Sequence, residues 1–527
     1  MSQLFKYFPG TQSVILCLSF ILIVGFFRVF QVGIHNPSWM IFVLIFSTAY
    51  SIILLGFRYS EVSEEMKIII RSLSICCTLY IIFSHPAYLP PNSIYFKTIL
   101  EFYFYITIAA GIISFWRPSF SLLPFVYIPI LKTAIEYLSK IPISKTDYAV
   151  VVETGMFSLL AISTIWILKQ SVGYLPALKL SKSFAFDKQK LGNFILFILI
   201  SIHFSNYFYA GYAKLMLDGP FLSWLSNETY NIMYQSLLIK TVPLQQSDWA
   251  KEKLAWLLEF LCLPSNLLVL ILQITTPLAL IHRKAILLYT VFFDFMHVFI
   301  FLSTGIFFWK WIILNTIIII CLRERSIKNI PPSLSVLGVI ICVGAPKIFY
   351  IPELGWYDTR EGNATYFKAV LQDDRVVTLP SNYFRNYSIT LAQQRLFLSS
   401  FSHKDVNSLG ASLSWEKYKD TYDCNVLTVQ PLKIHERNEA LVKLTDFIQN
   451  YHEFALTLAN QNGRYFYDFF PHHVWSNPYL FSKASNIDIR NIRAYIYTVM
   501  GYCIKNLERG RFVVQETSKE SFLIPIF

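Results

Sequence analysis

The chain has 527 residues, of which 54% are hydrophobic, 17% are aromatic and only 15% are charged. Soluble domains carry roughly 25% charged residues, so this composition excludes an ordinary soluble protein and indicates a chain that crosses a membrane several times. Lysine and arginine (45) outnumber aspartate and glutamate (33), which gives a net charge of +12. In a membrane protein this excess sets topology through cytoplasmic loops, and no basic run interleaved with aromatic residues points to nucleic acid as a partner.

Apolar stretches fill the chain up to about residue 351, and most reach the length of about 20 residues that a spanning helix needs. They run approximately 13–34, 39–57, 68–84, 98–116, 121–139, 149–169, 192–214, 255–281, 285–303, 307–323 and 331–351. We therefore predict an all-α polytopic bundle of about 10–11 spans over residues 1–351. Prolines predict a broken or re-entrant fifth stretch (Pro124, Pro129) and a break in the eighth (Pro264, Pro277).

Positive charge is distributed unevenly between the two ends of these stretches. With the N-terminus inside, the basic loops fall on one side: Arg58 to Lys67, Arg117, Lys169–Lys190, His282–Lys284 and Arg323–Lys328. The positive-inside rule makes that side cytoplasmic and puts residues 352–527 outside. We expect the bacterial inner membrane, or the endoplasmic reticulum if the host is eukaryotic. Three glycosylation sequons, at Asn227, Asn363 and Asn386, fall on the predicted outer side.

Residues 352–527 are more polar, and we expect a small extracytosolic α+β domain there. Alternation in Ala369–Leu379 predicts two strands joined about Asp373-Asp374. Helical patterns follow at 388–402, 436–460 and 486–507.

Two further features of this region are its cysteines and its adjacent histidines. Cys424 and Cys503 could pair if the region is extracytosolic. The segment Pro471–Trp475 is expected to pack at the surface near the membrane. No metal-ligand spacing occurs in the chain, so we predict no metal site.

The seventh stretch, Phe194 to Leu217, begins as an apolar helix and ends in a lysine. At about 100° per residue, one stripe carries small and polar residues: His203, Tyr207, Ala210 and Lys214, flanked by Asn206 and Gly211. Polar groups at membrane depth usually face a protein interior or a wet cavity. Ala210 and Gly211 leave a notch beside Lys214, where burial disfavours the ammonium form, and a neutral lysine is a base. The alternative is close helix packing at the small residues and a lysine that snorkels to the interface.

The ninth stretch carries Asp294 and His297 at i and i+3, on one face and near the middle of the membrane. The pair is either an acid–base device, in which the carboxylate orients the imidazole, or a polar clasp between helices. An amphipathic patch over Phe221–Leu238, which includes Trp224, either seals the bundle or forms a lid.

These residues resemble a known family. The stretch Tyr207–Leu215 (YFYAGYAKL) resembles the aromatic–Ala/Gly–x–x–Lys–Leu signature of the horizontally transferred transmembrane (HTTM) domain, which includes the vitamin K-dependent γ-glutamyl carboxylases. Similar features are Arg28 in the first span, Trp224 after the lysine, and His297 followed by Gly305-x-Phe307. The resemblance covers roughly residues 10–350.

The resemblance implies a lyase-type reaction with Lys214 as the base that deprotonates a reduced quinone, either vitamin K or menaquinol. The anion reacts with O2 to give a strong base, which removes a γ-proton from a peptide glutamate before CO2 adds. His203, Asp294 and His297 are expected to support Lys214. The expected cofactor contacts come from Tyr207, Asn206, Gly211 and Trp224.

A second hypothesis is a non-enzymatic membrane maturation or export factor. Its bundle would hold a membrane lipid or hydrophobic peptide, and its outer domain would recognise a secreted partner. A transporter is less well supported, because no inverted repeat is evident.

Overall fold

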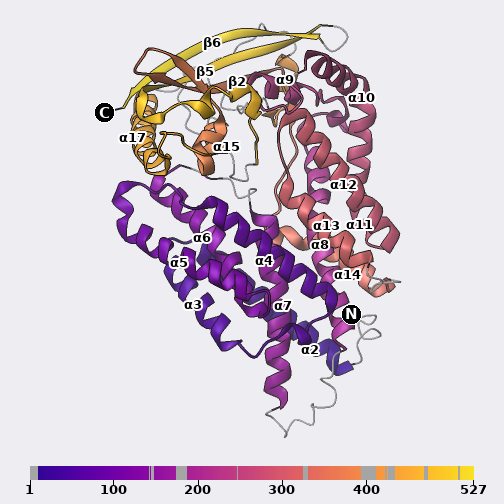
Figure 1. Cartoon of the computed structure of the whole chain (residues 1–527). Helices are drawn as coiled ribbons and strands as arrows, with labels where there is room; N and C mark the ends of the chain where they lie inside the picture. The colour runs from indigo at the N-terminus through magenta and orange to yellow at the C-terminus, as the bar shows by residue number, and fades with distance from the viewer. Residues whose placement is uncertain are drawn as a thin grey trace.

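The structure is a computed structural model that describes residues 10–141, 143, 148–173, 187–245, 247–323, 330–392, 411–421, 424, 434–467, 473–507 and 511–526. Within these residues, helices fill the chain up to Lys347 and a mixed region of strands and helices begins at Tyr357. Figure 1 shows the helices gathered in one bundle, with the strands placed over one end of it.

The bundle follows the predicted apolar stretches in order. Its main helices are α2 (Gly10–Ile34), α3 (Met40–Ile53), α4 (Glu64–Ser84), α5 (Ile94–Ile113), α6 (Leu122–Ser139), α7 (Ala149–Gly173), α8 (Lys188–Leu215), α10 (Asp248–Ile274), α12 (Arg283–Thr304), α13 (Trp309–Arg323) and α14 (Pro332–Gly344), with short α9 (Asn231–Leu238) and α11 (Thr276–Ala279) between them. In the described part of the chain, seven helices are long and apolar enough to cross a membrane, and shorter apolar helices accompany them. The predicted polytopic membrane bundle is confirmed.

The two proline-containing stretches behave differently. The predicted break in the fifth stretch is wrong, because α6 runs continuously from Leu122 to Ser139 with Pro129 inside it. Neighbouring helices surround α6 and can compensate for the hydrogen bond that proline removes. The eighth stretch does break: α10 passes through Pro264, ends at Ile274, and Pro277 lies in the separate helix α11.

Burial separates central from peripheral helices. In α6 and α8, 89% of the residues in the apolar window are buried, whereas only 17% are buried in the span that starts with α10 and 22% in α12. Large apolar side chains such as Phe260 and Phe295 point outward from these peripheral helices. Such outward faces are what a lipid environment requires, so α10 and α12 form one lipid-facing flank of the bundle.

Some of the basic loops predicted to share one side are in contact with neighbouring turns at the same end of the bundle. Lys169 forms a salt bridge with Glu61 at 3.4 Å, and the Lys188 ammonium donates to the Ser60 carbonyl at 3.5 Å. Arg117 donates to the Leu55 carbonyl at 3.1 Å. In Figure 1, α7 extends away from the strands toward this end of the bundle.

The strands form an antiparallel sheet in the order β3-β2-β5-β6, together with a small β1-β4 pair. Their bounds are β1 (Tyr357–Asp358), β2 (Glu361–Leu371), β3 (Val376–Leu379), β4 (Ala411–Ser412), β5 (Ile492–Leu507) and β6 (Arg511–Pro525). The predicted hairpin is confirmed, since Val370 pairs with Val376 and the turn contains Asp374 at a φ of 66°. Two of the helices of this region are α15 (Ser388–Ala392) and α16 (Trp415–Asp420).

One helix predicted for the C-terminal region is wrong. Residues predicted to be helical at 486–507 contain β5, which pairs with β2 on one side and β6 on the other. Aromatic and β-branched residues such as Tyr495, Tyr497 and Val499 favour this strand. The helix predicted at 436–460 is present as α17 (Ile434–Leu458), and the part of 388–402 beyond Ala392 lies outside the described residues.

The structure shows the three sequon asparagines buried and the two cysteines of the C-terminal region bonded to each other. Asn227, Asn363 and Asn386 are all buried, and Asn386 accepts a hydrogen bond from the Lys132 ammonium at 2.7 Å, so the folded chain does not present them as glycan acceptors. Cys424 and Cys503 form a disulfide with their Cα atoms 5.7 Å apart.

Candidate functional site

Lys214 lies in the last turn of α8, at the junction between the bundle and the C-terminal region. Its ammonium donates to the Ala210 carbonyl at 3.1 Å, to Gln273 Oε1 at 3.1 Å and to the Leu354 carbonyl at 3.0 Å. It also lies 5.0 Å from the ring centre of Trp224, which is a cation–π distance. Lys214 is therefore held by three different segments and covered by an aromatic ring.

The notch predicted beside Lys214 is filled by α10. A Cβ added to Gly211 would meet the Gln273 Cβ at 2.7 Å and the Ile274 nitrogen at 3.1 Å. Gly211 thus lets α8 and α10 approach closely, and the approach brings the Gln273 amide to Lys214. The close approach of α8 and α10 at Gly211 is what the helix-packing alternative expects. The Lys214 side chain turns back along its own helix and donates to the Ala210 carbonyl.

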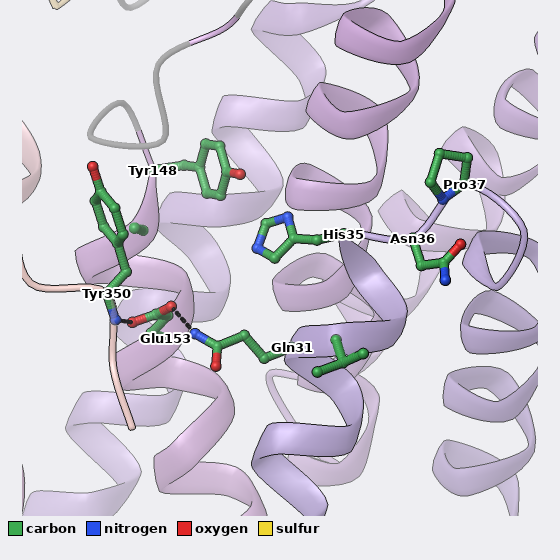
Figure 2. Close-up of a pocket in the computed structure, with 9 residues that line it drawn as sticks. Gln31, His35, Asn36, Pro37, Tyr148, Glu153 and Tyr350 are labelled. Atoms are coloured by element: carbon green, nitrogen blue, oxygen red, sulfur yellow. Dashed lines mark hydrogen bonds between the residues drawn. The ribbon is translucent and has the colours of Figure 1, made fainter. Parts of the chain in front are cut away.

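A single segment, Ile348–Gly355, is hydrogen-bonded to three charged residues of the bundle, two of which donate to it and one of which accepts from it. Arg28 of α2 donates to the Ile348 carbonyl at 3.1 Å, and Lys214 of α8 donates to Leu354. Glu153 of α7 accepts a hydrogen bond from the Tyr350 nitrogen at 3.0 Å, which Figure 2 shows as a dashed line. We call Ile348–Asp358 the linker, because it runs from the end of the bundle through β1.

The rest of the linker is held by the loop that follows α8. Trp224 Nε1 donates to the Trp356 carbonyl at 3.0 Å, and Trp356 Nε1 donates to Asp358 Oδ1 at 3.0 Å. Asp358 is only 5% exposed. Burial raises the pKa of its carboxyl group to about 7, while hydrogen bonds from Asn227 and Trp356 and the charge of Lys214 act in the opposite direction. Asp358 was not predicted from sequence, and Asn227 was singled out only as a sequon.

Three of the predicted site residues, His203, Tyr207 and Asp294, gather around an asparagine that sequence reasoning missed. Asn315 of α13 donates to Asp294 Oδ1 at 2.7 Å and to the Tyr207 hydroxyl at 3.0 Å. Its own Oδ1 lies 2.7 Å from His203 Nε2. The only sequence signal for Asn315 was that it is a lone polar residue in the apolar run of α13. This signal does not reveal its role, because its partners lie on two other helices, α8 and α12.

Asp294 and His297 share a helix face but have different partners. Asp294 bonds to Asn315, whereas the buried His297 ring lies 5.1 Å from Phe308 and 5.8 Å from Tyr207. Among the described residues, His297 Nδ1 has no hydrogen-bond partner. Asp294 is therefore hydrogen-bonded across from α12 to α13, as the polar-clasp alternative expects.

The segment His473–Trp475 packs on the turn between α12 and α13. The Phe307 nitrogen donates to the His473 carbonyl at 2.7 Å, and the Trp475 nitrogen donates to the Gly305 carbonyl at 2.9 Å. The His473 ring lies 5.0 Å from that of Phe308. The predicted packing role applies to these residues, while Pro471 and His472 lie outside the described residues.

The predicted site residues thus form two separate groups. His203 precedes Lys214 by eleven residues, which is about 16 Å along a helix. Tyr207 belongs to the deeper group and stacks on Phe293 at 3.6 Å, and the Asn206 amide donates to the His203 carbonyl at 3.1 Å. Trp224 belongs to the group around Lys214. Within the described residues, no cluster of His, Cys, Asp and Glu could hold a metal ion.

The fold and these two groups define a polytopic membrane protein with a C-terminal α+β region. Comparisons of the chain with family models, with curated proteins and with solved structures found no match.

Proposed function

We propose that the chain is a membrane enzyme, similar to the HTTM-domain carboxylases, in which Lys214 acts as a base toward a weakly acidic, lipid-soluble substrate. The observation that supports this most directly is the chemical nature of the groups that the Lys214 ammonium contacts. Its three hydrogen-bond partners are neutral oxygens, one side-chain amide and two backbone carbonyls, with no carboxylate among them.

Neutral partners matter for a buried base. A lysine paired with a buried carboxylate cannot lose its proton without leaving that charge unpaired, which is costly. Lys214 has no such constraint from its direct partners. As a neutral amine, Lys214 keeps two N–H donors and gains a lone pair. Two donors can serve only two of the three acceptors, so the hydrogen bond to the third would be lost and the amine could turn toward an incoming acid.

A reduced quinone is the substrate class that the resemblance implies, with O2 and CO2 as co-substrates. A quinone ring does not fit the notch at Gly211, because Gln273 fills that space. The proposal therefore rests on the chemistry of Lys214 and not on a preformed cradle for the ring. The cofactor contacts expected from Tyr207, Asn206, Gly211 and Trp224 are not part of it.

We also propose that the C-terminal region lies outside the cytosol, where a peptide substrate would reach it. The Cys424–Cys503 disulfide supports this orientation, because disulfides persist mainly in oxidising compartments. The contacts among the basic loops support it too, since they gather positive charge at the end of the bundle away from the strands.

A second candidate is a non-enzymatic maturation or export factor for a secreted peptide or a lipid. The contacts of the linker favour it, because Arg28, Glu153 and Lys214 all bond to Ile348–Gly355. In this hypothesis Lys214 anchors the C-terminal region to the bundle and performs no chemistry.

The deciding experiment measures quinone epoxide formed by the purified protein in lipid nanodiscs with O2 and reduced menaquinone or vitamin K. Lys214→Arg keeps a charged donor near the same oxygens but does not deprotonate, whereas Lys214→Ala removes both properties. The exposed Lys253→Arg is the matched control. The enzyme proposal expects epoxide from the unmodified protein and from Lys253→Arg, and none from either Lys214 variant.

The melting temperature of each variant separates the two candidates. If Lys214 is only an anchor, Lys214→Ala melts at a lower temperature, Lys214→Arg melts close to the unmodified protein, and no sample forms epoxide. Absence of epoxide from the folded, unmodified protein would overturn the quinol chemistry.

A further inference from the structure

A cavity of about 550 Å³ opens between α2, α7 and the linker. Figure 2 shows its polar and aromatic lining, which comprises Gln31, His35, Asn36, Tyr148, Glu153 and Tyr350. This volume is within the range of ligand sites, which is roughly 300–1,000 Å³. Neither the group around Lys214 nor the group around Asn315 contributes to the lining.

The position of the cavity corresponds to a membrane–water interface. His35 follows the last residue of α2, and Tyr148 precedes the first residue of α7. Trp39, two residues after the lining residue Pro37, and Tyr350 are both exposed, and aromatic residues are enriched at membrane interfaces. Val32 lines the cavity and is 66% exposed, so the cavity opens sideways, onto the outward face of α2.

Among the residues that the structure describes, the lining carries one carboxylate and no lysine or arginine. Glu153 Oε1 accepts a hydrogen bond from Gln31 Nε2 at 2.9 Å, and Oε2 accepts one from the Tyr350 nitrogen at 3.0 Å. These bonds hold the carboxylate at the wall of the cavity, and each carboxylate oxygen can accept more than one hydrogen bond. The nearby Arg28 donates to Gln31 and to the Ile348 carbonyl.

The chemistry of this lining selects a cation. A carboxylate attracts an ammonium group, and the rings of Tyr148 and Tyr350 offer the aromatic faces that cations prefer. The outward face of α2 continues from the opening with exposed Phe26 and Val29, which acyl chains can cover. An amphiphile with an ammonium headgroup matches both parts of the surface.

We propose that this cavity binds the primary-ammonium headgroup of a membrane lipid, such as phosphatidylethanolamine, in the leaflet on the strand side of the bundle. The ammonium donates to the Glu153 carboxylate between the two tyrosines, and the acyl chains lie along α2. This site is independent of any reaction at Lys214. It also places a lipid against the linker, through Tyr350.

The test is native mass spectrometry of the full chain released from nanodiscs with equal amounts of phosphatidylethanolamine, phosphatidylcholine and phosphatidylglycerol. The unmodified protein is expected to retain phosphatidylethanolamine preferentially. Glu153→Gln removes the charge with little change in shape and is expected to lower that retention about tenfold, as for other hydrogen bonds to charged groups. Equal retention of the three lipids would overturn the proposal.

A second variant keeps the test informative if Glu153→Gln disturbs the linker. Val32→Trp places bulk at the opening and leaves the contacts of Glu153 in place, so it is also expected to lower retention. Val336→Trp, at an exposed position on α14, is the matched control and should have no effect. Displacement of the bound lipid by free ethanolamine would assign the cavity to a soluble amine and overturn the lipid proposal, as would unchanged retention in both cavity variants.

Discussion

Asn227 and Asp358 exchange two hydrogen bonds across 131 positions of the chain. The Asn227 amide donates to Asp358 Oδ2 at 2.8 Å, and the Asp358 nitrogen donates to Asn227 Oδ1 at 2.7 Å. Asn231 adds a hydrogen bond to the Asp358 carbonyl at 3.1 Å. These bonds attach the loop after α8 to the first strand of the C-terminal region, and they do so through a buried acid.

The acid predicts a pH dependence of stability. Burial raises the pKa of Asp358 from 3.8 to about 7, so the folded state binds a proton that the unfolded chain has already released above about pH 4. Stability is therefore expected to fall as the pH rises from about 4 through about 7. The melting temperature should be higher at about pH 5 than at about pH 8.

Asp358→Asn mimics the protonated group and is expected to weaken this dependence. Glu361 acts in the same direction, because burial and then the charge of Asp420 raise its pKa to about 7. The melting temperature of the double variant Asp358→Asn, Glu361→Gln should therefore depend on pH even less. Asp373→Asn, at an exposed turn, is the control. A double variant with the slope of the unmodified protein would contradict the assignment.

Gly211→Ala is expected to destabilise the protein by about 1–3 kcal/mol, because the new methyl group would meet Gln273 and force α8 and α10 apart. Gly25→Ala is the matched control, since a Cβ there meets no heavy atom within 4 Å. Thermal unfolding in detergent measures both. Equal melting temperatures for the two variants would show that the close contact of Gly211 with Gln273 does not contribute to stability.

Asn315→Leu is expected to cost about 2–5 kcal/mol, because it removes a donor from Asp294 and Tyr207 and leaves the facing nitrogen of His203 buried without its partner. Thr316→Val changes the next residue, which is exposed and bonds within its own helix. Chemical unfolding followed by tryptophan fluorescence compares them. The clasp would be refuted if Asn315→Leu were as stable as Thr316→Val.

Removal of the disulfide is expected to loosen the C-terminal region. Cys424 and Cys503 are 79 positions apart, and a disulfide typically stabilises a fold by about 2–4 kcal/mol. The double variant Cys424→Ser, Cys503→Ser should show faster proteolysis of the strands than of the helices. Cys262→Ser, at a cysteine that the structure describes as free, serves as the control. Proteolysis at unchanged rates would argue against a stabilising bond.

Local patterns predicted the parts of the fold that depend on local chemistry. The length of the apolar runs identified the bundle helices, and Asp373-Asp374 marked the β2–β3 turn. The failures came from tertiary contacts. Pro129 suggested a break that surrounding helices suppress, and the pattern at 486–507 read as helical although two partner strands hold β5 extended.

The candidate site was predictable only in its parts. Lys214 was identified from its own helix, but its partners Gln273 and Leu354 lie 59 and 140 positions away, and nothing in the spacing indicates them. For the same reason the small residue Gly211 suggested an open notch, when a residue from α10 occupies it. Asn315 was missed because an isolated polar residue acquires its role only from the helices that surround it.

The linker has a mechanical consequence. It is held by α2, α7 and α8 in turn, and then by the loop that carries Trp224 and Asn227, so little of it is left to act as a hinge. A load applied to the strands is therefore shared at once among three helices in the bilayer.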